Sequence, residues 1–163
     1  MGCELDLHNH KYENPFDVDA HSENGVLPPA LIFSPNLVNA EVGEIVPVNI
    51  SVLEVSGVGG IHAQVKYDAS ILSISAVKIA SFFASNQEPF LLYKDQGGIL
   101  DVYISYLGSE MSVSGTGDVA TITFQVNTEG NASIRFTENS EFLGPNDIPI
   151  KIKGYGKGVI IAK

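Results

Sequence analysis

The chain has 163 residues, of which 44% are hydrophobic, and nineteen acids against nine bases give it a net charge of −10. This length and composition suit one core-forming domain, and the negative charge excludes nucleic acid and anionic lipid surfaces as partners, because both are polyanions. The single cysteine, Cys3, excludes a disulfide scaffold or a Cys-rich zinc site, and the sequence has no run of about 18 apolar residues that could span a membrane.

The first 28 residues differ in character from the rest. They hold six acids and one base, and they show neither strand nor helix periodicity. We therefore predict an acidic linker or arm over 1–28 and a domain over 29–163. His8, His10 and His21 lie among carboxylates in this arm, a pattern that we interpret as a solvated polar linker and not as a metal site.

From Ala30 onward, short β-rich runs alternate with turns that contain Gly, Asn, Asp and Pro. No segment has a clear helical pattern, although 78–86 is compatible with one or two helical turns. The strands that we predict are 30–34, 44–54, 60–67, 71–79, 90–94, 98–106, 118–127, 132–137, 148–153 and 157–162. About ten strands of this kind predict an all-β fold, a two-sheet antiparallel β-sandwich.

No catalytic motif is recognisable, and we predict that the protein is not an enzyme. By strand alternation His62 faces outward, and it has no recognisable serine or cysteine nucleophile as a partner. Asp95 and Asp101 flank one hairpin, where turn formation explains them better than a pair of catalytic carboxylates.

We likewise predict no cofactor. The pattern closest to a calcium loop is Asp17-x-Asp19-x-His21. It has Ser22 where the loop needs glycine and Pro28 where it needs glutamate, so structural calcium is not indicated either.

Three segments carry a resemblance to a known family. They are GVGGIHAQVKYD from Gly57, GILDVYIS from Gly98 and VSGTGDVATITFQV from Val113. With the closing run GVII from Gly158, they resemble cohesins over about residues 30–162. The resemblance implies a jelly-roll sandwich related to carbohydrate-binding modules, and a non-catalytic receptor that binds dockerin modules through one sheet face.

In cohesins, the strand after the Gly-rich turn supplies polar residues that bind the partner. The resemblance implies that strand 60–67 of this sequence takes that position. The Asn and Asp typical of that strand fall at Gly60 and His62, so the chain is more similar to cohesin-like domains of the non-cellulosomal type. The predicted face consists of Gly60, His62, Gln64, Lys66, Asp101, Tyr103, Ser105 and Arg135. Among these, His62, Tyr103 and Arg135 are the expected anchors, because Tyr and Arg are enriched among binding hot spots.

The N-terminus resembles that of a mature bacterial lipoprotein, in which a cysteine after a small residue carries the lipid. Gly2-Cys3 followed by an acidic, Asn-rich stretch fits this pattern, with Met1 in place of the signal peptide. The resemblance implies a lipid anchor on Cys3, an extracellular or cell-surface location, and a tether role for the residues that follow. Membrane contact would then occur only through that lipid.

Two other functions stay open at this stage. A carbohydrate-binding module would take polysaccharide on exposed aromatic rings, but the chain has no tryptophan. A structural subunit of an extracellular assembly would bind its own kind, with the arm 1–28 docking on a neighbour. The partner is therefore a dockerin-like module, a second copy of the chain or a polysaccharide.

Overall fold

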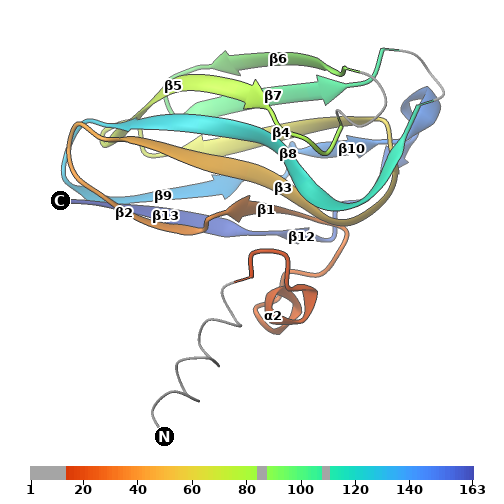
Figure 1. Cartoon of the computed structure of the whole chain (residues 1–163), viewed down its shortest axis with the longest axis horizontal. Helices are drawn as coiled ribbons and strands as arrows, with labels where there is room; N and C mark the ends of the chain where they lie inside the picture. The colour runs from red at the N-terminus through yellow and green to blue at the C-terminus, as the bar shows by residue number, and fades with distance from the viewer. Residues whose placement is uncertain (1–13, 84–87, 108–110) are drawn as a thin grey trace, which may run out of the picture.

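The computed structural model describes residues 14–83, 88–107 and 111–163, and these residues form two stacked layers of β-strands (Figure 1). This arrangement confirms the predicted all-β, two-sheet sandwich. Most neighbouring strands are antiparallel, but two short pairs are parallel: β1 with β12, and β13 with β2. Among the described residues, no helix is long and apolar enough to cross a membrane.

The first layer is a five-stranded sheet in the order β12-β1-β3-β8-β5. Its strands are β12 (Gly154–Tyr155), β1 (Ala30–Ser34), β3 (Ile45–Val58), β8 (Val113–Val126) and β5 (Leu72–Ile79).

The second layer is an eight-stranded sheet, and its order along the main path is β11-β10-β4-β9-β13-β2. The strand β7 pairs with β4, and β6 pairs with β7. The strands are β11 (Pro149–Ile150), β10 (Glu141–Leu143), β4 (Gly60–Tyr67), β9 (Gly130–Phe136), β13 (Lys157–Ala162), β2 (Leu37–Ala40), β7 (Ile99–Ser105) and β6 (Phe90–Asp95).

The core lies between the two sheets and follows the alternation of the strand sequences. Ala120, Ile122, Phe124 and Val126 of β8 all point inward and are at most 1% exposed. Successive side chains of a strand point to opposite faces, so these four residues bury one face of β8 and leave the other polar. Across the sandwich, aromatic rings join the sheets, as where Phe124 packs edge-on against Tyr67 of β4 with ring centroids 5.9 Å apart.

The structure differs from the sequence predictions mainly in short elements. It adds β2, β10 and β12, and it reduces the predicted strand 148–153 to the two residues of β11. These elements have two to four residues each, which is too short for a periodic pattern, and they form only because a longer strand already offers free backbone groups beside them.

The segment 78–86, which is compatible with one or two helical turns by sequence, is described only up to residue 83. Residues 78–83 continue β5 and then turn, whereas an α-helix, α2 (Val18–Glu23), forms inside the acidic arm. Asp17 caps this helix, because its side chain accepts a hydrogen bond from the amide of Ala20 at 3.1 Å. A single-turn 3-10 segment, η1 (Pro145–Asp147), is the other helical element of the described chain.

The part of the arm that the structure describes lies against the domain, beside β1 and β12 (Figure 1). Phe16 and Val26 pack on Ala30, Ile32 and Leu53, which point away from the main core on the outer side of the five-stranded sheet. Residues 14–29 therefore cover an apolar patch that would otherwise meet water, and they do so within their own chain.

Candidate binding face on the eight-stranded sheet

The eight residues predicted as a binding face lie on three neighbouring strands of the eight-stranded sheet. Gly60, His62, Gln64 and Lys66 belong to β4, Asp101, Tyr103 and Ser105 to β7, and Arg135 to β9. The pairing register sets His62 beside Tyr103, Gln64 beside Asp101 and Lys66 beside Arg135. The intervening residues of these strands are buried, so the structure brings the eight positions together on the outer face, while their role in binding stays a prediction.

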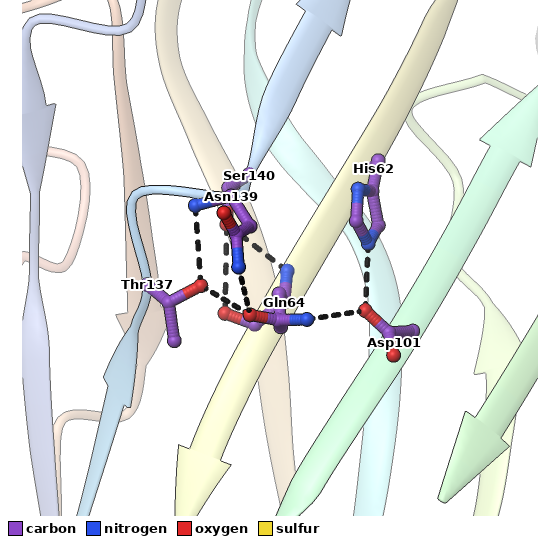
Figure 2. A network of polar contacts seen from close by, with 6 residues as sticks. All are labelled: His62, Gln64, Asp101, Thr137, Asn139 and Ser140. Atoms are coloured by element: carbon purple, nitrogen blue, oxygen red, sulfur yellow. Dashed lines mark hydrogen bonds and ion pairs between the residues drawn. The ribbon is translucent and has the colours of Figure 1, made fainter.

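A continuous polar network occupies the middle of this face (Figure 2). The imidazole Nε2 of His62 donates to Oδ1 of Asp101 at 2.7 Å, and the amide nitrogen of Gln64 donates to the same oxygen at 2.9 Å. The amide oxygen of Gln64 accepts hydrogen bonds from the Thr137 hydroxyl at 2.6 Å and from the Asn139 amide at 3.0 Å. Each side chain is thereby held in one orientation before any partner arrives.

The network exists because β4 changes its partner at Gln64. On one side of β4, β9 pairs with Val65 to Tyr67 and β10 pairs with Gly60 to His62, and the chain loops out over 137–140 between them. The Gln64 backbone is satisfied by that loop instead of by a strand: Gln64 accepts from the Thr137 amide at 2.9 Å and donates to the Ser140 hydroxyl at 3.0 Å.

His62 and Tyr103 form a stacked pair next to the network. Their ring centroids are 4.3 Å apart and their planes differ by 8°. Tyr103 is nevertheless 41% exposed, so the ring offers apolar surface and a hydroxyl to a partner while its neighbour fixes its position.

Asp101 is the charged centre of the network. Partial burial tends to raise its carboxyl pKa, but the hydrogen bonds from His62 and Gln64 outweigh that effect, and the pKa lies below its usual value. The carboxylate is thus charged at neutral pH and favours the folded state, in which its partners are in place.

This shift predicts how stability depends on pH. Asp101→Asn removes the charge, and we expect it to lower the free energy of unfolding at pH 7 by about 1 to 2 kcal/mol, as for hydrogen bonds to a charged group. A carboxyl whose pKa is lower in the folded state stabilises above its unfolded pKa of about 4 and stops doing so as pH falls through the folded pKa. Urea denaturation of both proteins from pH 7 to pH 3 should therefore show the difference shrinking below about pH 4; a difference that grows there contradicts the assignment.

Sequence reasoning missed the apolar part of the face. Phe90 and Leu92 of β6 lie opposite Ser105 and Tyr103 of β7 and are 47% and 54% exposed. With Tyr103 they form a stripe of exposed apolar side chains across two strands. The alternation of β6 could have revealed it once the pairing with β7 was known, because Leu91 between them packs toward the core.

Sequence reasoning also missed that Lys157 extends the face. Lys66, Arg135 and Lys157 lie side by side on β4, β9 and β13, and all three are exposed. Like charges directly opposite each other in a sheet are unfavourable, so sheet stability does not account for this row. It lies at the end of the face away from Gly60, about 20 Å along β4 at the usual rise per residue.

Three residues singled out in the sequence lie outside the described residues. These are the lipid anchor at Cys3 and the histidines His8 and His10. His21 is described, and its Nε2 donates to the backbone carbonyl of Pro15 at 2.8 Å. Within residues 14–83, 88–107 and 111–163, no three His, Cys, Asp or Glu residues gather as a metal site would require.

The fold is a β-sandwich, and the outer face of its eight-stranded sheet carries a prearranged polar network. The family model named Cohesin domain matches residues 33–153, which is well over half of the chain, and the chain belongs to the cohesin family. No curated protein sequence matches the chain.

Solved structures share the fold at low sequence identity. A non-cellulosomal cohesin from the archaeon Archaeoglobus fulgidus is 18% identical, with a TM-score of 0.68 over 82% of this chain and 90% of that one. A type II cohesin from the cellulosome of Acetivibrio cellulolyticus is 19% identical, with a TM-score of 0.67 over 80% and 92%. A Clostridium thermocellum complex named Coh-OlpC-Doc435, a type I cohesin–dockerin complex, gives 17% identity and a TM-score of 0.64 over 82% and 94%.

Proposed function

We propose that the chain is a non-catalytic module that binds a dockerin-like protein on the outer face of the eight-stranded sheet. The observation that carries the proposal is the exposed apolar stripe of Phe90, Leu92 and Tyr103 beside the His62–Asp101–Gln64 network. Membership of the cohesin family and similarity to cohesins solved together with dockerins support the choice of partner.

The face has the composition of a protein-binding surface. Apolar and aromatic side chains on β6 and β7 can exclude water beside the polar network, and charged side chains such as Lys66 and Arg135 lie at the other end of the face. Because hydrogen bonds already fix Gln64 and Asp101, a partner would lose little side-chain entropy by binding there. The resulting mechanism is recognition by a rigid platform.

The opposite face of the sandwich is a weaker candidate. Asn49 and Thr121, on neighbouring strands there, hydrogen-bond to each other at 2.7 Å, and the apolar patch of that side is covered by Phe16 and Val26. Phe16 and Val26 thus pack within their own chain, which argues against the arm docking through them on a neighbouring copy.

The location that fits this function is extracellular, where cohesin-like receptors meet secreted partners. The proposed lipid on Cys3 would hold the domain at the cell surface, with the first residues as the tether.

Affinity capture tests the proposed function. The full chain is immobilised, the secreted fraction of the source organism is passed over it, and mass spectrometry identifies what remains bound. We expect a dockerin-bearing protein, which is then produced as an isolated module and measured by titration calorimetry. Retention of only the chain itself, or of polysaccharide, would reject the proposal in favour of assembly or glycan binding.

A further inference from the structure

A cavity of about 470 Å³ opens at one end of the binding face. It lies where β4 begins, between β7 and the segment from β10 to η1. Its walls include His62 and Tyr103 of the face, so whatever binds the face also covers the mouth of the cavity.

Two successive glycines, Gly59 and Gly60, line the cavity, and the missing side chain has a different effect at each. A Cβ on Gly59 would lie 2.8 Å from the carbonyl oxygen of Met111, so the backbone approach there tolerates no side chain. A Cβ on Gly60 would meet its nearest neighbours, including Ser105, at an ordinary 3.5 Å. The hollow beside His62 and Tyr103 therefore exists because residue 60 leaves space that a side chain could fill.

The walls combine apolar surface with negative charge. Met111, Leu143 and the ring of Tyr103 supply the apolar part, and the carboxylates of Glu141 and Asp147 supply the charge. Among the described residues, no lysine or arginine lines the cavity and neither carboxylate has an ion-pair partner. The basic group of the face that lies closer to the cavity than the row containing Lys66 is Lys94 of β6, opposite Asp101 of β7.

We propose that this cavity binds the guanidinium group of an arginine side chain. A guanidinium is planar, forms paired hydrogen bonds to carboxylates, and stacks on aromatic rings, and its three-carbon stem suits apolar walls. Glu141 and Asp147 neutralise the charge, and the exposed ring of Tyr103 lies against the stem or the plane.

The source of that arginine is the protein partner, and this assignment rests on the proposed function. A second copy of the chain is a poor source, because it carries the same net charge of −10 and its single arginine, Arg135, lies in its own binding face. The partner is thus expected to present an exposed arginine at the edge of its binding surface, at the end facing Gly60.

Titration with a small probe tests the cavity without any partner. The full chain, labelled with ¹⁵N, is titrated with N-acetyl-arginine amide and, separately, with N-acetyl-citrulline amide, which has nearly the same shape and no charge. We expect the amide signals of Gly60, Leu143 and Gly144 to shift with the arginine probe, at a dissociation constant on the order of millimolar. The citrulline probe should bind at least tenfold more weakly.

Variants locate the effect. The double variant Glu141→Gln with Asp147→Asn should lower the affinity for the arginine probe at least tenfold. The control pair, Glu44→Gln with Glu129→Gln, makes the same change in net charge at the opposite end of β3. It should leave the affinity within twofold of the wild type. Gly60→Val keeps both carboxylates but fills the hollow, and it should also weaken binding of the arginine probe. If the double carboxyl variant does not fold, this variant tests whether the cavity is the binding site.

Equal shifts with both probes, or arginine shifts that the control pair abolishes as well, would overturn the proposal. So would the absence of any shift at the cavity in a folded chain. Because no dockerin enters this titration, a chain that binds a dockerin and ignores arginine keeps its proposed function and loses only the cavity assignment.

Discussion

Leu92→Ala combined with Tyr103→Ala is expected to weaken binding of the dockerin-like partner at least about 100-fold. Both side chains are exposed on the outer face, at 54% and 41%, and they lie directly opposite each other on β6 and β7. Truncating a hot-spot side chain of an interface costs about 2 kcal/mol or more, Tyr is enriched among hot spots, and we expect the Leu92–Tyr103 pair to act as one.

The control for this variant is Ile45→Ala. Ile45 is 60% exposed and begins β3 in the other sheet, so the substitution removes a comparable apolar side chain outside the proposed face. Titration calorimetry with the captured module should give the same affinity for the control as for the wild type. If both variants bind normally, the partner uses another surface; if both fail, the loss is not specific to the face.

Phe124→Ala is expected to cost about 3 to 5 kcal/mol of the free energy of unfolding. Phe124 is fully buried near the C-terminal end of β8, between β3 and β5, and its ring packs against that of Tyr67 from the opposite sheet. Removing the ring deletes the transfer free energy of its apolar surface and leaves a cavity that two hydrogen-bonded sheets cannot close.

Urea denaturation measures this loss, with Gln125→Ala as the neighbouring control. Gln125 is exposed on the same strand, and its truncation should change the free energy of unfolding by less than about 0.5 kcal/mol. Should the alanine variant be too unstable to measure, Phe124→Leu should still show a loss of about 1 to 2 kcal/mol. A loss below about 1 kcal/mol for Phe124→Ala would mean that this ring does not hold the sheets together.

The long strands could be predicted from the sequence because their alternation is a local property. In β8, residues 120, 122, 124 and 126 are apolar, the residues between them (Thr121, Thr123 and Gln125) are polar, and the structure buries the apolar four. The same alternation predicted which side chains of β4 and β7 point outward, because side chains on one face of a strand recur every two residues.

The arm shows where local reasoning stops. Its composition predicts a solvated linker, yet Phe16 and Val26 have a place to pack because Ala30, Ile32 and Leu53 form a second apolar patch on the outer side of a sheet. That patch comes from strands β1 and β3, which the alternation alone would assign to one buried face. The strand β1 (ALIFS) has no polar alternation because both of its sides are buried.

The sequence by itself determined the two-sheet β class and the inward and outward sides of the principal strands. Through its resemblance to cohesins, it also predicted which strand would carry a binding face. The tertiary structure decided which of these side chains meet. Gln64 binds Thr137, Asn139 and Asp101, which are far from it in the chain, and Glu141 and Asp147 line the same cavity as Gly60 because β10 pairs with β4. Strand pairing between distant segments is selected by the free energy of the whole sandwich, with every buried backbone group satisfied, and no local pattern encodes it.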